Sequence, residues 1–206
     1  ILGLEIAGTV AGIGDDVDDW ETGDRVCALL AGGGYAEYAA VHADMVLPVP
    51  DDMDLETAAG IPEVFYTAYL NLVVEGEMTA DDIVLIHAGA SGVGTAAIQI
   101  ADQRGATVWS TASGGKLPVL RQLGAERAID RHDESFADVV QTELDARDGV
   151  DLILDPVGAD YLSDNLDSLS TDGRLVLIGL LGGASTDISL ATLLTRRLRI
   201  IGSVLR

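Results

Sequence analysis

The sequence predicts an α/β fold in which a doubly wound, six-stranded parallel sheet follows a smaller β-rich domain. The residues at Ile83–Ile86 form a continuous apolar run, typical of a parallel strand that is covered on both faces. A Gly-rich turn follows this run and leads into apolar residues at helical spacing. Strand-like and helix-like segments then alternate to the end of the chain, as they do in βαβ units.

The second part of the chain contains six strand candidates with helices between them. We expect strands at 83–87, 107–112, 127–129, 150–155, 174–178 and 199–204. We expect helices near 93–104, 116–123, 135–146, 160–168 and 188–197, and a leading helix over 64–74. This number and order of elements complete a doubly wound sheet of the kind that binds dinucleotides.

The first part of the chain reads differently, and the two patterns meet near residues 55–66. Short β-type runs at 5–10, 25–30, 35–41 and 45–49 are separated by glycine-containing turns. These runs predict an antiparallel, barrel-like β unit.

The 206 residues carry 34 acidic and 12 basic side chains, a formal net charge of -22. Such a charge repels nucleic acid and anionic membranes, and no apolar run approaches the length of a membrane span. The acids are spread through a well-patterned sequence rather than gathered in a tail. We therefore interpret the chain as salt-adapted, from a cytoplasm in which salt screens the self-repulsion.

The single cysteine, Cys27, excludes intrachain disulfides and favours a reducing, cytoplasmic location. Its strand-like surroundings predict a buried, inert thiol. The three histidines lie far apart in the sequence, and no cysteine pair exists to complete a zinc site. We expect no metal.

The turn from His87 to Gly94 carries the strongest functional signal. At the start of a helix, backbone N–H groups and the positive end of the helix dipole favour an anion. Gly92 leaves room for a pyrophosphate, and Gly94 lets the helix pack closely against the strand. On these residues alone, a plain tight turn remains the alternative.

The end of the second strand bears on the choice of cofactor. An acidic residue there binds the ribose 2′-hydroxyl of NAD, whereas a nearby cation accommodates the 2′-phosphate of NADP. Residues 110–116 contain no carboxylate and end on Lys116, the only lysine of the chain. Arg131, after the third strand, is a second candidate cation. Both could instead be solvated surface residues.

Several motifs follow one another in an order that resembles a known family. These are Gly3–Gly8, Gly23–Val26, Gly32–Tyr38, Ala58–Pro62, His87–Gly94 and Leu152–Gly158. Together they resemble the zinc-free quinone oxidoreductases, the zeta-crystallin-like branch of the medium-chain dehydrogenase/reductase superfamily. The resemblance covers essentially the whole chain.

This resemblance implies that residues 1–65 are part of a GroES-like catalytic domain and residues 66–206 an NADPH-binding Rossmann domain. Leu4 stands where zinc-dependent relatives carry a metal-binding histidine, and Arg131 stands where a tyrosine is common. The implied substrate is a small-molecule quinone. The predicted cofactor-binding residues are Thr67, Gly89, Ser91, Gly92, Val93, Gly94, Ser113, Lys116, Arg131, Val157, Ile178, Gly179 and Leu180.

The resemblance also implies segments beyond both ends, and because the chain starts at Ile1 we expect it to be an internal excerpt. Family members pair the last strand of the cofactor sheet across a two-fold axis, so we expect a homodimer through residues 199–205. No catalytic residue is assigned. Tyr66 and His87 are candidate proton donors, but each fits a structural role better.

Three other functions deserve comparison with a quinone reductase. The scaffold could bind NADPH without turnover, as a structural or sensor protein, or it could reduce α,β-unsaturated ketones. A serine hydrolase is disfavoured because Val93 stands where a nucleophile elbow needs glycine. The acidic run at 15–19 lacks the ligand spacing of a calcium loop and reads as a solvated turn.

Overall fold

The computed structural model describes residues 2–205, and the chain divides into two compact units after Tyr66. We call residues 2–66 the β unit and residues 67–205 the sheet unit. Among residues 2–205, no helix is long and apolar enough to cross a membrane.

The sheet unit contains one six-stranded sheet with the order β6-β5-β4-β7-β8-β9, in which every neighbouring pair is parallel. The strands are β4 (Ile83–Ile86), β5 (Thr107–Ala112), β6 (Arg127–Asp130), β7 (Val150–Asp155), β8 (Leu169–Leu177) and β9 (Arg199–Gly202). The order reverses between β4 and β7, as in a doubly wound sheet. This confirms the predicted fold class. β8 begins five residues before the predicted strand, and its register against β7 shifts between Val150 and Leu152.

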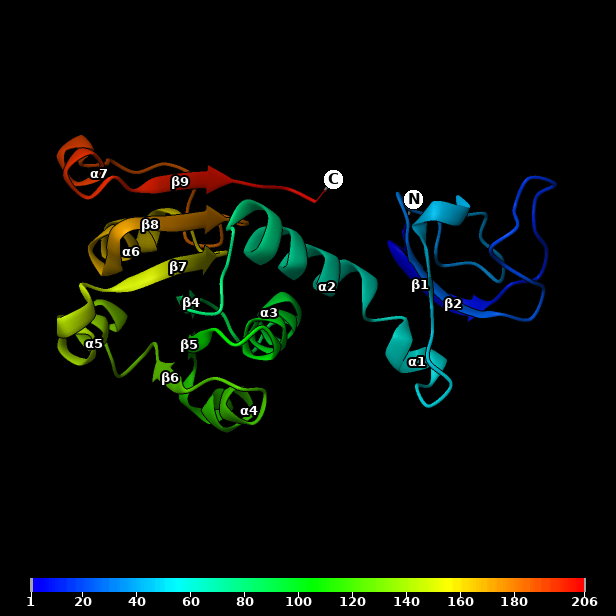
Figure 1. Ribbon diagram of the computed structural model, residues 1–206, viewed down its shortest axis with the longest axis horizontal. Coiled ribbons are helices and arrows are strands. Elements are labelled where there is room, and N and C mark those ends of the chain that lie inside the picture. Colours follow the sequence, from blue (N-terminus) through cyan, green and yellow to red (C-terminus); the bar gives the residue numbers. More distant parts are fainter. Residues whose placement is uncertain (1, 206) are drawn as a thin grey trace. The chain divides into compact units, whose positions relative to one another are not determined.

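Helices lie on both faces of this sheet, with α3 and α4 on one side and α5 and α6 on the other (Figure 1). Their bounds are α3 (Gly92–Gln103), α4 (Leu117–Gln122), α5 (Phe136–Glu143), α6 (Leu162–Ser168) and α7 (Leu190–Arg196). The predicted leading helix is α2 (Pro62–Tyr69), which continues as a π-helix over Leu70–Glu75. All predicted helices therefore exist, most of them a few residues shorter.

The core of the sheet unit follows from the apolar strands. Residues 84–86 of β4 are fully buried, and alternate side chains of the strands point to opposite faces. On the face beneath α5 and α6, Leu85 and Ile153 pack with Trp109, Phe136 and other apolar residues in one cluster. This core holds the carboxyl ends of the strands in fixed positions.

The β unit is a three-stranded antiparallel sheet in the order β1-β2-β3. Its elements are β1 (Glu5–Thr9), β2 (Arg25–Leu29), a 3-10 helix at Ala43–Met45, β3 (Val46–Pro48) and α1 (Leu55–Ala58). Cys27 is 4% exposed and packs in a small cluster with Val49 and Ala58. This exposure confirms the prediction of a buried cysteine, and burial raises the pKa of its thiol.

The strand predicted at 35–41 is wrong. These residues form bends and coil, and the side chains of Tyr35 and Tyr38 are 82% and 79% exposed. A strand exists only when a neighbour supplies hydrogen bonds, and none of the β-unit strands in residues 2–66 pairs with this segment. The alternating pattern alone could not show whether a partner is present.

Candidate functional site

The carboxyl ends of all six parallel strands meet at one edge of the sheet, where ligands bind in open α/β folds. The turns that follow β4, β5, β6, β7 and β8 all lie there. Twelve of the thirteen predicted cofactor-binding residues come from these turns or from the first turn of α3: Gly89, Ser91, Gly92, Val93, Gly94, Ser113, Lys116, Arg131, Val157, Ile178, Gly179 and Leu180.

The turn after β4 is built as a helix start. Ser91 is the N-cap of α3, and its Oγ accepts a hydrogen bond from the Gly94 amide at 3.1 Å. A Cβ on Gly94 would lie 2.4 Å from the Ala88 carbonyl oxygen and 2.6 Å from the Cα of Gly89, so only glycine allows this close approach. Ala88 has a φ of 52°, an uncommon conformation for alanine.

This cap leaves the first amides of the helix available. Ser91 and Gly92 are exposed, and the amides of Gly92 and Val93 donate to no acceptor within residues 2–205. Helix α3 has 12 residues, enough for its dipole to add to these amides. The turn can therefore accept an anion such as a pyrophosphate.

Two cations lie at the ends of the neighbouring strands. Lys116 follows β5 and Arg131 follows β6, and the Arg131 amide donates to the carbonyl of Ala112 at 2.9 Å. Both side chains are exposed, and neither forms an ion pair within the described residues. They are thus available to a second anionic group.

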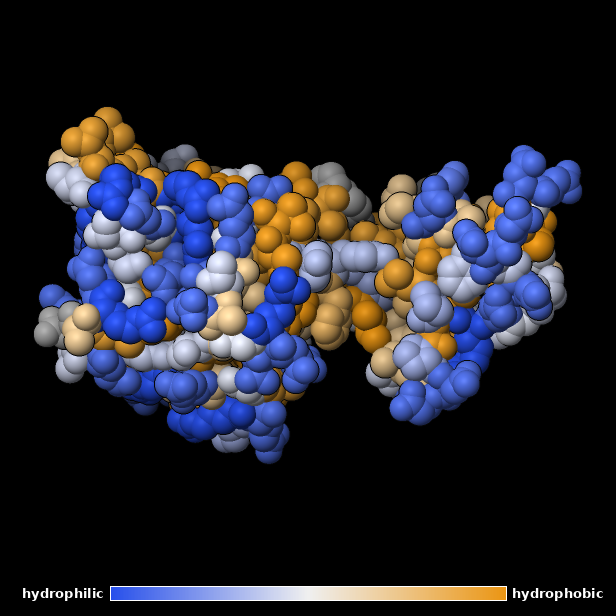
Figure 2. All heavy atoms as spheres, viewed as in Figure 1, coloured by the Kyte–Doolittle hydropathy of each residue, from blue (hydrophilic) through white to orange (hydrophobic). Residues whose placement is uncertain are grey.

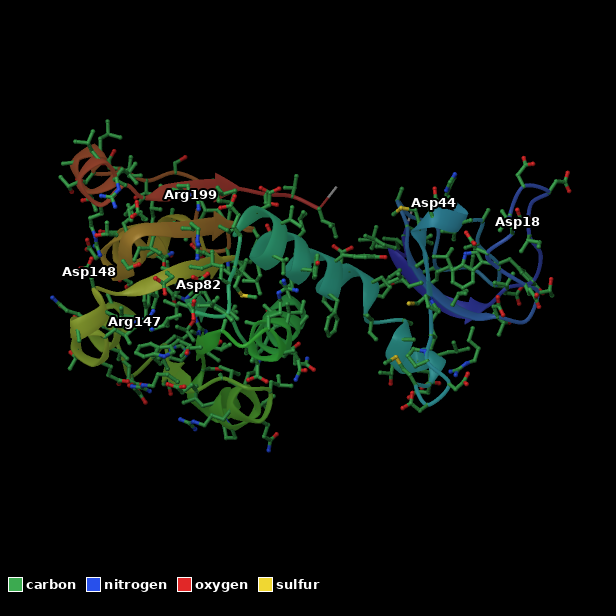
Figure 3. The ribbon with its side chains drawn as sticks, in the orientation of Figure 1. Asp18, Asp44, Asp82, Arg147, Asp148 and Arg199 are labelled. Atoms are coloured by element: carbon green, nitrogen blue, oxygen red, sulfur yellow. The ribbon has the colours of Figure 1, made fainter. Side chains whose placement is uncertain are left out.

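Three arginines at the opposite edge of the sheet are paired with carboxylates, and Figure 3 labels two of them, Arg147 and Arg199. Arg174 lies 2.5 Å from the carboxylate of Asp82, and Arg199 lies 3.0 Å from Glu77. Arg147 lies 3.6 Å from Asp151 and donates to the Asp81 carbonyl. These ion pairs link neighbouring parts of the sheet unit. Lys116 and Arg131, at the carboxyl edge, form no ion pair within residues 2–205 and so have no comparable structural role.

Hydrogen bonds join the turns after β7 and β8. The amide of Gly182 donates to the Val157 carbonyl at 2.7 Å, and Leu181 donates to Pro156 at 3.2 Å. A Cβ on Gly179 would lie 2.7 Å from the Pro156 carbonyl oxygen. The structure therefore brings Val157 together with the segment 178–180, as a shared cofactor site would need.

A series of hydrogen-bonded, buried polar side chains leads to the turn after β7. Thr111 Oγ1 lies 3.0 Å from His87 Nδ1, and His87 Nε2 lies 2.7 Å from Asn165 Oδ1. The Asn165 amide donates to Asp155 at 3.0 Å. The Asp155 carboxylate in turn accepts the amides of Val157, at 2.5 Å, and Gly158, at 3.1 Å. The carboxylate fixes the turn after β7.

The hydrogen bonds from Thr111 through His87 and Asn165 to Asp155 all run in one direction, each group donating to the next. Because the Asn165 amide group donates to Asp155, its oxygen faces His87, so Nε2 of His87 carries the proton and Nδ1 accepts from the Thr111 hydroxyl. The rings of Phe136 and Tyr161 pack against the imidazole at 4.6 and 4.9 Å. All four members of the chain are almost completely buried.

Burial lowers the pKa of His87 to about 4, so the imidazole is neutral at physiological pH. Burial also raises the pKa of Asp155, although the amides of Val157 and Gly158 act in the opposite direction. A neutral histidine with no exposed surface has a structural role, in agreement with the interpretation from the sequence. Sequence reasoning missed Thr111, Asn165 and the role of Asp155, because no local pattern links them.

The remaining candidates lie in and around α2. Tyr66 is half-buried in the β unit, and burial raises the pKa of its hydroxyl. Thr67, the first residue of the sheet unit, accepts a hydrogen bond at its carbonyl from Asn71 at 2.8 Å. Within residues 2–205, no three His, Cys, Asp or Glu side chains gather as a metal site would require.

Comparison with known proteins assigns the family. Residues 92–206 match the family model described as zinc-binding dehydrogenase, and residues 1–51 match the alcohol dehydrogenase GroES-like domain. The chain belongs to the zinc-binding dehydrogenase family. This places it in the medium-chain dehydrogenase/reductase superfamily and confirms that part of the resemblance, together with the GroES-like and Rossmann-like regions.

The relatives include two kinds of protein. The chain is 35% identical over 182 residues to highly-reducing polyketide synthase 1 of Aureobasidium melanogenum, covering 86% of this chain and 8% of that protein. It is 34% identical over 179 residues to the quinone oxidoreductase of Sus scrofa, covering 86% of this chain and 54% of that protein. The chain thus spans only part of its curated relatives.

Solved structures also match nearly the whole chain. The enoyl reductase of CurK superposes with a TM-score of 0.87 at 31% identity, covering 98% of this chain and 60% of that one. A mycobacterial protein, Rv1454c, solved in complex with NADPH, superposes with a TM-score of 0.85 at 32% identity, covering 98% and 64%. The matches thus include a quinone oxidoreductase, an enoyl reductase and a structure that holds NADPH.

Proposed function

We propose that the chain belongs to an NADPH-dependent, zinc-independent oxidoreductase that passes reducing equivalents from the nicotinamide to a quinone. One observation carries the proposal: open helix amides and two unpaired cations lie at the carboxyl edge of a doubly wound sheet. Arg104 and Arg121 also form no ion pair within residues 2–205, but they lie at the C-terminal ends of α3 and α4, so it is the combination of cations with open helix amides that points to an anionic ligand.

The residues at this edge fit NADPH. The amides of Gly92 and Val93 would bind the pyrophosphate, and Lys116 and Arg131 would bind the 2′-phosphate. A charge-assisted contact of this kind contributes roughly 1.5–3 kcal/mol. The turns at 157 and 178–180 would border the nicotinamide, and Thr67 is proposed to lie near that end as well.

When bound, NADPH supplies the reducing equivalents. The residues of this chain bind and orient the cofactor and exclude water. His87 takes no part in proton transfer, because it is buried and neutral, and it instead supports the turn after β7 through Asn165 and Asp155. Zinc independence rests on Leu4, which stands at the position of a metal-binding histidine in the resembled family.

A second candidate reaction is reduction of an α,β-unsaturated carbonyl compound. The similarity to the CurK enoyl reductase and to a highly-reducing polyketide synthase favours it. A binding protein without turnover is the third candidate. All three share the cofactor site. The first two differ in the acceptor, and the third has no acceptor.

Turnover separates the three candidates. NADPH oxidation is followed at the nicotinamide absorbance with a quinone and, separately, with an enoyl thioester. The proposal predicts faster oxidation with the quinone. Faster oxidation with the thioester would replace the quinone by an enone, and NADPH binding without oxidation by either acceptor would indicate a binding protein.

The cofactor assignment is tested at the lysine. Lys116→Glu should weaken NADPH binding by tenfold or more, because it replaces an attraction by a repulsion, and leave NADH binding nearly unchanged. Arg104→Glu is the matched control, because Arg104 is exposed at the far end of α3 and undergoes the same charge change. Equal losses for both cofactors in Lys116→Glu would contradict the role of the lysine.

We also propose that the protein is a homodimer through the outer edge of the sheet. Within residues 2–205, β9 is the last strand and pairs only with β8. The preceding helix α7 exposes Leu190 and Leu194, which are 72% and 80% exposed (Figure 2). An open strand edge beside apolar side chains invites association. Sedimentation in molar salt should give a dimer, and a monomer at all concentrations would contradict the proposal.

A further inference from the structure

The end of β5 holds a carboxylate that the sequence of β5 does not show. In dinucleotide folds, an acidic residue about 20 residues beyond the glycine turn contacts the adenosine ribose. That position is occupied here by Gly114, which follows β5. The absence of an acid in residues 110–116 led to the prediction of a site selective for NADPH.

The structure places the carboxylate of Asp130 in the space that a side chain at position 114 would fill. A Cβ built on Gly114 would lie 2.1 Å from Oδ2 of Asp130 and 3.2 Å from its Cγ. Asp130 is the last residue of β6 and pairs in register with Ala112 of β5. The adjacent strand thus delivers a carboxylate to the backbone of Gly114.

One oxygen of this carboxylate is available to a ligand. Oδ1 accepts the backbone amide of His132 at 3.0 Å. Oδ2 accepts no hydrogen bond from any group within residues 2–205, and Asp130 forms no ion pair there. This holds although Arg131 is the next residue and Lys116 follows the neighbouring strand, β5. The side chain is half-buried, and its amide-bound oxygen fixes its orientation.

We propose that Asp130 is a specificity-determining residue that accepts a hydrogen bond from the adenosine ribose and repels a 2′-phosphate, so that the site binds NADH as well as NADPH. This inference rests on the proposed cofactor site and refines its specificity. A carboxylate accepts a hydroxyl hydrogen bond well, but the same negative charge disfavours a phosphate at that place. Lys116 and Arg131 act in the opposite direction.

The opposing charges of Asp130 and of the two cations determine how the affinities for NADPH and NADH should change. A hydrogen bond to a charged group changes affinity by about tenfold or more. Removing the charge of Asp130 should therefore strengthen NADPH binding and weaken NADH binding. The ratio of the two affinities, which cancels any general loss of binding, should shift toward NADPH by about tenfold.

The test measures dissociation constants for NADPH and NADH in the wild type, Asp130→Asn and Asp133→Asn at one fixed salt concentration, because salt screens these charges. Asp130→Asn keeps an oxygen for the His132 amide and so preserves the local structure. Asp133→Asn is the matched control, since Asp133 is exposed and its substitution changes the net charge equally. Thermal unfolding checks that each variant is folded.

The outcomes are distinct. A shift of the affinity ratio in Asp130→Asn but not in Asp133→Asn supports the inference. An unchanged ratio in Asp130→Asn, with both cofactors still bound, overturns the role of Asp130 and leaves the cofactor site intact. A wild type that binds neither cofactor overturns the proposed function itself, and this inference with it.

Discussion

The sheet unit and the β unit differ in the size of their apolar cores and in their ratio of acidic to basic residues. The sheet unit buries a continuous core on its strands, whereas the β unit has one small cluster around Cys27 and leaves Tyr35 and Tyr38 exposed. Residues 67–206 carry 20 acidic and 11 basic side chains. The β unit carries 14 acidic residues and a single arginine, Arg25.

The use of arginine sharpens the difference. In the sheet unit, Arg127, Arg147, Arg174, Arg197 and Arg199 pair with carboxylates. Arg25 instead donates to the carbonyls of residues 50, 51 and 53. The β unit therefore has weak apolar cohesion and almost no charge compensation, and we expect the sheet unit to be the more stable of the two.

Each unit contains one tryptophan, Trp20 in the β unit and Trp109 in the core of the sheet unit. Trp20→Phe leaves Trp109 as the fluorescent reporter of the sheet unit, and Trp109→Phe leaves Trp20 as the reporter of the β unit. The predictions below use these two reporters to compare the units.

The largest expected effect is on the packing of α3 against β4. Gly94→Val should abolish the cooperative unfolding transition of Trp109, because a Cβ at this position meets the Ala88 carbonyl oxygen at 2.4 Å. We expect a loss of more than about 4 kcal/mol. Gly8→Val is the control in β1, where a Cβ would meet nothing within 4 Å. An unaltered Trp109 transition in Gly94→Val would contradict the close packing.

The buried chain of polar groups gives the next largest effect. Asn165→Leu leaves the Nε2 proton of His87 without a partner in an apolar core, and it removes one of the two hydrogen bonds that Asp155 Oδ2 accepts. The free energy of unfolding, measured by urea with Trp109 as reporter, should fall by about 3–5 kcal/mol. A change below about 1 kcal/mol would show that water or another group replaces the amide.

The pH dependence of stability follows from His87. Its folded pKa of about 4 lies below the ordinary value of 6.5, so the unfolded chain binds this proton more readily. Stability contributed by neutral His87 is therefore complete above pH 6.5 and is lost as the pH falls toward 4, by roughly 3 kcal/mol. His87→Gln should remove this loss, and the difference between the two unfolding curves isolates it from the carboxylates. A difference that does not vary over this range would refute the assignment.

Salt should act on the two units unequally, with the smallest effect. Between 0.1 and 2 M potassium chloride, screening of repulsion should raise the stability reported by Trp20 more than that reported by Trp109, by on the order of 1 kcal/mol. The physical reason is the single arginine among the carboxylates of the β unit. An equal change in the unfolding free energy reported by Trp20 and by Trp109 would contradict this difference between the units.

The sequence predicted the sheet unit well because its signals are local. Apolar runs, helical spacing and the glycine turn at 89–94 each lie within a dozen residues, and together they dictate the strand order through known rules of connection. The predicted strand at 35–41 failed because its existence depends on a partner strand rather than on its own pattern. Local signals cannot supply that information.

The same limit applies within the candidate site. The turn residues and Lys116 were predicted from their own neighbourhoods. Asn165 is 78 residues from His87, and Asp130 reaches Gly114 only through the register of β6 on β5. Contacts of this kind follow from the packed sheet, so the direction of the polar chain and the carboxylate beside Gly114 became visible only in the structure.

The central claim is that the carboxyl edge of the sheet unit binds a nicotinamide dinucleotide. Isothermal titration calorimetry tests it most directly, with NADPH and NADH titrated into the protein in molar potassium chloride at two temperatures, so that a vanishing enthalpy at one does not hide binding. We predict saturable binding of one cofactor molecule per chain. Absence of saturable heat with either cofactor at both temperatures would contradict the account.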